Sequence, residues 1–315
     1  MDNFWEKYRW TEYYAHFFLN ADDIREDCEP LIMDHGDKRE HVIVLVHGLT
    51  DSPYFMRAIG RYFHQELGFN VVIPLLQTHG LKEPNGMKGV SLEEWKKNVA
   101  FAVEEAAKRG HHVSIGGLST GGALSVYQAM KEPNSITGGV FLFSAAIDLA
   151  GRTGEIFERL LRTPVASVLD YREDRDGEPL VGDNPYRYSR MDKGGARQLS
   201  RLIKEVDNLT EEKWDNREKA PLQPLFVAHS EADAAANIQG ATSLLAAKVK
   251  NAEKTSSENQ SRFFRIAKGF NVSHASVVLQ EPVFAKNGSP LEPANPFFDN
   301  MMRSAGELAR EYLGV

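Results

Sequence analysis

The sequence predicts an α/β protein built on a doubly wound, mostly parallel sheet, and two patterns support this prediction. Short β-prone runs alternate with helix-prone segments in the first and last parts of the chain, which is typical of strand–helix–strand units. Several of these runs are apolar without interruption, as in HVIVLV at 41–46. A strand that is covered by helices on both faces has this composition. The 315 residues suffice for one large domain or two small ones.

Local signals place the elements in order along the chain. We expect strands at 41–46, 71–74, 113–115, 139–143, 224–229 and 262–266. We expect helices at 53–67, 91–109, 123–130, 238–250 and 297–312. The second of these helices begins at a capping box formed by Ser91 and Glu94, and Gly110 ends it.

The chain divides into three parts by composition. Residues 1–40 form an aromatic-rich N-terminal segment, and 41–147 together with 223–315 form the α/β core. In 148–222 charged residues dominate and strand signals vanish, although 199–209 carries the pattern of an amphipathic helix. We interpret 148–222 as an inserted cap over the carboxyl edge of the sheet. The alternative is a solvated excursion without a role in binding.

Aromatic residues crowd the start of the chain, namely Phe4, Trp5, Tyr8, Trp10, Tyr13, Tyr14, Phe17 and Phe18. Several are four positions apart, so we expect one helix that packs an aromatic face on the main domain. The alternatives are a dimer contact, a flap over the active site, or a peripheral contact with a membrane surface. The oligomeric state stays open.

Charge and cysteine content exclude several classes of protein. The net charge of −7 and the pI near 5.8 argue against a surface for nucleic acid. The single cysteine, Cys28, excludes an intrachain disulfide and a cysteine-rich metal site. No apolar run approaches the roughly 18 residues of a membrane-spanning helix. The first residues do not have the pattern of a signal peptide, so we expect a cytoplasmic protein.

One glycine-rich stretch, 117–121, reads Gly-Leu-Ser-Thr-Gly and matches G-x-S-x-G. A β-prone segment precedes this motif and a helix-prone segment follows it. A serine between a strand and a helix occupies a sharp, strained turn that exposes its oxygen, which is the setting of a nucleophile. We therefore predict that Ser119 is a catalytic nucleophile. The alternatives are a plain glycine-rich turn and a phosphate-binding loop, but G-x-G-x-x-G is absent here.

A serine hydroxyl needs a base to take its proton and a carboxylate to orient that base. His274 follows the last expected strand, and Asp233 follows the strand before it. The chain order Ser119, Asp233, His274 is nucleophile, acid, base, as expected when the catalytic groups lie beyond the carboxyl ends of parallel strands. Other carboxylates stay open as the acid: Glu231 and, within the insertion, Asp207 and Asp215.

An oxyanion intermediate needs preorganised N–H donors. We predict that one donor is Thr120, which follows the nucleophile, and that the other comes from the loop after the strand at 41–46. Gly48 lets this loop turn its amides inward, which makes Leu49 the second donor. We expect His47 to be a strand-end histidine that is hydrogen-bonded to the backbone.

Four motifs together resemble those of α/β-hydrolases of the carboxylesterase and monoacylglycerol lipase group. These are HGLTDSP at 47–53, GLSTGG at 117–122, PLFVAHSEAD at 224–233 and SHASVV at 273–278. The resemblance covers 41–315. It implies an α/β-hydrolase fold with Ser119, Asp233 and His274 as the triad, Leu49 and Thr120 as oxyanion donors, and no metal or cofactor. The chain departs from the family in its aromatic N-terminal segment, its long polar insertion and the residues Ala-Ala-Ala-Asn after the acid.

The resemblance and the ordered triad predict a serine hydrolase that cleaves carboxylic esters through an acyl-enzyme. We expect a small-molecule ester with a short or medium acyl chain, monoacylglycerols among the candidates. The alternatives are an acyltransferase or a thioesterase with the same triad. A third alternative is a hydrolase-like binding protein without catalysis, which the complete triad argues against.

Overall fold

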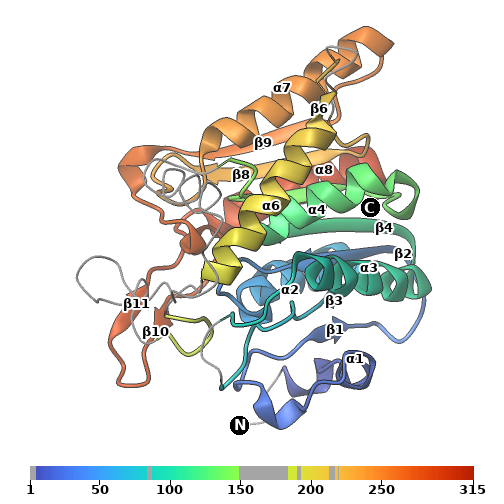
Figure 1. Ribbon diagram of the computed structural model, residues 1–315. Coiled ribbons are helices and arrows are strands. Elements are labelled where there is room, and N and C mark those ends of the chain that lie inside the picture. Colours follow the sequence, from blue (N-terminus) through green and yellow to red (C-terminus); the bar gives the residue numbers. More distant parts are fainter. Residues whose placement is uncertain (1–4, 84–86, 149–183, 190–192, 213–216, 219) are drawn as a thin grey trace.

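The computed structural model describes residues 5–83, 87–148, 184–189, 193–212, 217–218 and 220–315. A seven-stranded sheet runs through it in the order β1-β3-β2-β4-β5-β8-β9 (Figure 1). The strands are β1 (Leu31–Met33), β2 (Arg39–Val46), β3 (Asn70–Ile73), β4 (Gly110–Leu118), β5 (Val140–Phe143), β8 (Leu225–Ser230) and β9 (Ser261–Ile266). Only β1 pairs antiparallel with its neighbour in this sheet. The predicted doubly wound, mostly parallel sheet is confirmed.

Helices cover both faces of the sheet. On one face lie α3 (Leu92–Arg109), α4 (Thr120–Lys131), α6 (Lys193–Thr210) and α7 (Ile238–Thr255), and on the other lie α2 (Arg57–Leu67) and α8 (Phe298–Leu313). Each face of the sheet packs against its helices in a separate hydrophobic core, and alternate residues of β2 contribute to each. Val42, Val44 and Val46 belong to the core under α3 and α4, and Ile43 and Leu45 belong to the core under α2 and α8. Burial on both faces explains why β2 is apolar without a break.

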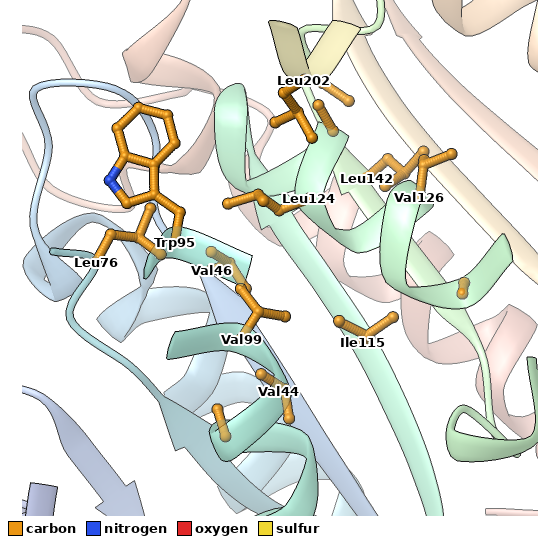
Figure 2. Packing of buried hydrophobic residues seen from close by; sticks show 14 of the residues in the cluster. Val44, Val46, Leu76, Trp95, Val99, Ile115, Leu124, Val126, Leu142 and Leu202 are labelled. Atoms are coloured by element: carbon orange, nitrogen blue, oxygen red, sulfur yellow. The ribbon is translucent and has the colours of Figure 1, made fainter. Parts of the chain in front are cut away.

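The core on the first face joins strands to helices far apart in the sequence. Figure 2 shows Val44 and Val46 of β2 packed near Trp95 and Val99 of α3, with Leu202 of α6 above Leu124 of α4. The amphipathic helix expected at 199–209 is therefore confirmed as part of α6. Within the predicted cap at 148–222, residues 149–183, 190–192, 213–216 and 219 lie outside the described residues, and the domain boundaries stay predictions.

Short elements complete the described part. They are η1 (Glu6–Tyr8), α1 (Thr11–His16), η2 (Ala21–Asp23), η3 (Pro53–Met56), η4 (Pro133–Ser135), β6 (Glu211–Glu212), β7 (Arg217–Glu218), η5 (Lys268–Phe270), η6 (Ala275–Val278), β10 (Val283–Phe284) and β11 (Pro290–Glu292). Strands β10 and β11 form a small antiparallel hairpin. Within the described ranges, no helix has the length and apolar character needed to cross a membrane.

The expectation of one N-terminal helix was wrong. The segment forms η1 and α1, with Trp10 between them in a non-helical conformation. The Trp10 N–H donates to the carbonyl oxygen of Pro30 at 2.9 Å, and this bond to the chain beside β1 interrupts the helical hydrogen bonds. The aromatic residues do pack on the main domain: Trp10 is 1% exposed and stacks on Phe101 of α3. Phe18, by contrast, is 95% exposed.

The capping box at the start of α3 is not formed. Ser91 occupies the N-cap position, but its side chain makes no capping hydrogen bond. The side-chain oxygen of Gln77 instead accepts the backbone N–H of Ser91 at 2.9 Å. The helix starts where the sequence predicted, although a residue from a distant loop satisfies its first turn.

Candidate active site

Ser119 lies in a strained turn between β4 and α4. Its φ of 54° and ψ of −117° are unusual for a residue with a side chain. Its N–H donates to the Phe143 carbonyl at 3.1 Å, and its own carbonyl accepts from the N–H groups of Ala123 at 3.1 Å and Ala146 at 3.0 Å. These three backbone bonds hold the turn at the carboxyl edge of the sheet.

Glycines beside Ser119 allow the turn to exist. A Cβ on Gly117 would stand 2.5 Å from the Val46 carbonyl oxygen, and one on Gly121 would stand 2.0 Å from the same atom. Both distances are far inside van der Waals contact, and the obstacle is backbone that cannot swing away. The motif glycines are thus required by the close approach of β2 to the turn.

Asp233 and His274 are brought together at the same edge of the sheet. The Oδ2 atom of Asp233 lies 2.7 Å from Nδ1 of His274, and Oδ1 accepts the N–H groups of Ala235 at 2.8 Å and Ala236 at 2.9 Å. Burial raises the pKa of Asp233, but the His274 charge and these hydrogen bonds outweigh burial and hold it below its usual value. The carboxylate therefore stays ionised and fixes the proton of His274 on Nδ1.

The alternative acids lie elsewhere. Glu231 forms an ion pair with Arg265 and accepts the N–H of Lys268 at 3.0 Å, so its carboxylate is held away from His274. Asp207 is on α6, and Asp215 lies outside the described residues. Of these carboxylates, the structure pairs only Asp233 with His274 in its described part.

A second histidine, His229 at the end of β8, supports the acid. Its Nε2 atom lies 3.7 Å from Oδ2 of Asp233 and 3.2 Å from the Ala236 carbonyl oxygen. Burial lowers the pKa of His229, while Asp233 and the Ala236 carbonyl oppose that shift. A neutral His229 donates its Nε2 proton toward the loop that carries Asp233. By sequence, His229 is only the last residue of the strand expected at 224–229, and no local pattern links it to Asp233.

The expected oxyanion loop lies against the nucleophile. The N–H of Asp51 donates to the Gly48 carbonyl at 3.3 Å and closes a turn from Gly48 to Asp51. A Cβ on Gly48 would stand 3.2 Å from the Ser119 Cβ atom. Among the described residues, no hydrogen bond uses the N–H of Leu49 or of Thr120. Both N–H groups are therefore unused in the described part, that of Leu49 on the Gly48–Asp51 turn and that of Thr120 directly after Ser119.

His47 has the structural role expected from the sequence. Its Nδ1 atom donates to the Gly48 carbonyl at 3.0 Å, and its Nε2 atom accepts the Leu76 N–H at 3.1 Å. Burial, followed by the neighbouring His79, lowers the pKa of His47 well below its usual value. The neutral ring therefore links the oxyanion loop to the chain after β3.

A buried charge cluster that the sequence did not predict lies behind this loop. Arg187 Nε is 3.0 Å from Asp51 Oδ1, and Arg187 Nη1 is 3.1 Å from Glu292 Oε1. Burial raises the pKa of Asp51 to about 6. The charges of Arg187 and His274 oppose this shift. Asp51 precedes the helix expected at 53–67, as a capping residue would, and no local signal links it to Arg187. We refer to Asp51, Arg187 and Glu292 as the charge cluster.

The arrangement supports nucleophilic acyl transfer. Ser119, Asp233 and His274 follow β4, β8 and β9, whose carboxyl ends lie at one edge of the sheet. Within the described part, no hydrogen bond joins the Ser119 hydroxyl to His274. Catalytic hydrogen bonds of this kind often shorten only when substrate is bound. No group of three histidine, cysteine or carboxylate side chains among the described residues is arranged to hold a metal ion.

Comparison with known proteins agrees with this geometry. Residues 37–258 match the family model described as serine aminopeptidase, S33. The thermostable monoacylglycerol lipase of Bacillus sp. (strain H-257) is 30% identical over 131 residues, which is 40% of this chain and 50% of that protein. This chain therefore spans about half the length of that relative.

Solved structures of low sequence identity share the fold. A metagenome-derived lipolytic enzyme superposes with a TM-score of 0.66 at 17% identity, over 91% of this chain and 99% of the other. The monoacylglycerol lipase of Paleococcus ferrophilus gives 0.59 at 16%, over 89% and 97%. The monoglyceride lipase of Saccharomyces cerevisiae, bound to a substrate analogue, gives 0.62 at 13%, over 90% and 92%.

The family match covers most of the chain, and the solved structures share its fold. The predicted α/β-hydrolase fold is confirmed. The predicted relationship to lipases and esterases is confirmed at the level of the family. The chain belongs to the S33 serine aminopeptidase family of α/β-hydrolases.

Proposed function

We propose that the protein is a serine hydrolase that cleaves carboxylic esters through an acyl-enzyme. One observation carries the proposal: the strained Ser119 turn and the 2.7 Å Asp233–His274 pair occupy the same edge of the sheet. Ser119 is the nucleophile, His274 the base and Asp233 the residue that orients the base.

The proposed reaction has two halves. Nε2 of His274 takes the proton of Ser119 as Oγ attacks the ester carbonyl carbon, and the N–H groups of Leu49 and Thr120 stabilise the oxyanion. Collapse of this intermediate expels the alcohol, which receives the proton from His274, and leaves an acyl-enzyme. Water then attacks the acyl carbon with His274 as base, and the acid is released as Ser119 regains its proton.

We propose short- or medium-chain esters as substrates, monoacylglycerols among them. The Bacillus relative supports this choice, since it is a monoacylglycerol lipase. The family description names an aminopeptidase, and the same acyl-enzyme chemistry applies to amides. Acyl transfer to another alcohol, or from a thioester, also remains compatible with this site. The assay must therefore separate these acyl donors and acceptors.

The test measures hydrolysis of nitrophenyl esters across acyl lengths, of monoacylglycerols, of an acyl thioester and of aminoacyl nitroanilides. Replacement of Ser119 by Ala should lower kcat by at least about 10⁴-fold without loss of fold. The matched control is Ser125→Ala, six residues further along the chain in α4, where the hydroxyl donates to the Gly121 carbonyl at 2.7 Å. This control should keep at least a third of the activity, by the usual modest effect of one hydrogen bond.

Product analysis completes the test. An ester product that appears only when an alcohol is added would identify an acyltransferase. Equal turnover by the wild-type protein and Ser119→Ala would reject the proposed nucleophile. Serine-dependent cleavage of nitroanilides alone would favour the aminopeptidase activity of the family description.

A further inference from the structure

Thr50 is held in a conformation that its side chain disfavours. It is the third residue of the turn closed by the Asp51 N–H and the Gly48 carbonyl, and its φ is 67°. A turn with positive φ at the third position usually has glycine there. Threonine is β-branched, so this backbone is strained, and strain persists only where surrounding groups hold it.

The groups that hold Thr50 come from 184–189, a described stretch within the predicted insertion at 148–222. The Tyr188 N–H donates to the Thr50 carbonyl at 2.8 Å. Nη2 of Arg187 donates to Thr50 Oγ1 at 3.3 Å, and Nε of Arg187 is 3.0 Å from Asp51 Oδ1. Two consecutive residues of the turn are thus held by one guanidinium.

Arg187 is itself fixed. Its Nη1 atom lies 3.1 Å from Glu292 Oε1 on β11, and the same oxygen accepts Nδ2 of Asn184 at 2.8 Å. The side chains of Arg187, Asp51 and Glu292 are 10%, 1% and 11% exposed. Two guanidinium nitrogens therefore donate hydrogen bonds, Nη1 to Glu292 and Nη2 to Thr50, while Nε is in ion-pair contact with Asp51 without hydrogen-bond geometry. A planar guanidinium held at two nitrogens is fixed in orientation in a way that an ammonium group is not.

We propose that Arg187 is a positioning residue that holds the Gly48–Asp51 turn so that the Leu49 N–H faces the oxyanion. This inference rests on the proposed function, in which that N–H stabilises the oxyanion. Arg187 acts through Thr50 and Asp51 and takes no part in bond formation. Because an oxyanion donor acts mainly in the transition state, its misplacement lowers kcat more than it changes KM.

The experiment compares Arg187→Lys and Arg187→Met with the wild-type protein. Arg187→Met leaves two buried carboxylates unpaired and endangers folding, so Arg187→Lys, which retains the positive charge, is the principal variant. We expect its kcat for nitrophenyl ester to fall about 10- to 100-fold, with KM changed less than about threefold, as for a weakened oxyanion donor.

The matched control is Arg25→Met. Arg25 Nη1 donates to the Arg187 carbonyl at 3.0 Å and Nε donates to the Leu81 carbonyl at 3.0 Å, so it holds the same segment. None of these contacts involves the Gly48–Asp51 turn. Its kcat should stay within about threefold of the wild-type value, by the modest net effect of such bonds.

A suppressor variant separates positioning from general stability. Glycine adopts positive φ without strain, so Thr50→Gly should keep the turn in place with less help from Arg187. The double variant Thr50→Gly/Arg187→Lys should recover about tenfold in kcat over Arg187→Lys, if strain at Thr50 is what misplaces the donor. Equal kcat values for these two variants would overturn the inference.

Hydrogen exchange gives a readout that needs no turnover. Amide hydrogens in the peptide 47–52 should exchange at least about tenfold faster in Arg187→Lys than in the wild-type protein or Arg25→Met. If the wild-type protein cleaves esters through Ser119 while Arg187→Lys keeps its kcat, Arg187 has no positioning role and the proposed function stands. If the wild-type protein cleaves no ester, the proposed function fails. In that case, equal exchange rates in 47–52 for Arg187→Lys and the wild-type protein would separately reject the role of Arg187.

Discussion

Two strained turns meet at the candidate active site, and they are held in different ways. Ser119 and Thr50 both have positive φ, and they follow β4 and β2, which are neighbours in the sheet. Ser119 is held by backbone hydrogen bonds and by glycines within two positions of it. Thr50 is held by Arg187, a side chain 137 positions away. Main-chain hydrogen bonds and close backbone packing therefore maintain one half of the site, and the charge cluster, together with one main-chain bond from Tyr188, maintains the other.

The turn at Ser119 should be broken most severely by Gly121→Ala. The new Cβ would stand 2.0 Å from the Val46 carbonyl oxygen, and neither backbone can move far within the sheet. We expect the free energy of unfolding to fall by about 4 kcal/mol or more, which urea titration would measure. The control is Gly269→Ala, where no atom lies within 4 Å of the added methyl group. Similar losses in both variants would show that crowding at the turn is not the cause.

The second turn is hydrogen-bonded to the neutral His47, and a second buried histidine, His79, lies beside His47. His79 is fully buried beside His47, with ring centroids 5.0 Å apart, and burial lowers the pKa of His79 from 6.5 to about 4. The unfolded chain therefore binds an extra proton between these pH values, so the free energy of unfolding falls as pH falls from 6.5 to 4. The contribution of His79 to this loss is about 3 kcal/mol.

The comparison of the wild-type protein with His79→Gln isolates this contribution. Denaturant titrations at several pH values would give the free energy of unfolding of each protein. The wild-type curve should fall about 3 kcal/mol further than that of the variant between pH 6.5 and pH 4. Parallel curves would mean that His79 does not titrate below its usual range.

The smallest effect concerns Thr50 itself. Thr50→Ala keeps a Cβ in the left-handed region and removes the hydrogen bond from Arg187, so it should lower the free energy of unfolding by about 1 kcal/mol. Thr50→Gly also removes that bond but relieves the strain, and should be more stable than Thr50→Ala by about 1 kcal/mol. Thermal unfolding of the two variants would measure the difference. A glycine variant less stable than the alanine variant would show that φ at this position is not a source of strain.

The same contrast explains what the sequence could predict. The strand at 41–46, the motif around Ser119 and the strand ends before Asp233 and His274 are local patterns, and each was found at its expected place in the fold. The charge cluster could not be predicted, because Asp51, Arg187 and Glu292 lie in three distant segments. Each of them, taken alone, resembles an ordinary surface or capping residue.

The two wrong expectations, like the charge cluster, involve contacts between distant parts of the chain. The helical spacing near the N-terminus was real, but a backbone bond to Pro30 removes Trp10 from any helix. Ser91 and Glu94 matched a capping box, but the Gln77 side chain takes the N–H of Ser91. In both cases a partner from elsewhere in the chain competed with a local signal, and the tertiary contact prevailed.

Because Thr50 and Arg187 are 137 positions apart, the ribosome synthesises Thr50 long before the side chain that holds it. When the ribosome has produced β2, the Gly48–Asp51 turn and the Ser119 motif, neither Arg187 nor Glu292 yet exists. N-terminal parts of a chain begin to fold during synthesis, and at that stage Thr50 has nothing to hold its strained backbone. In terms of the proposed mechanism, a nascent chain therefore carries Ser119 well before it can hold the Gly48–Asp51 turn in place. By the proposed role of Arg187, full reactivity at Ser119 requires a chain that extends at least through Glu292 on β11, the last residue of the charge cluster.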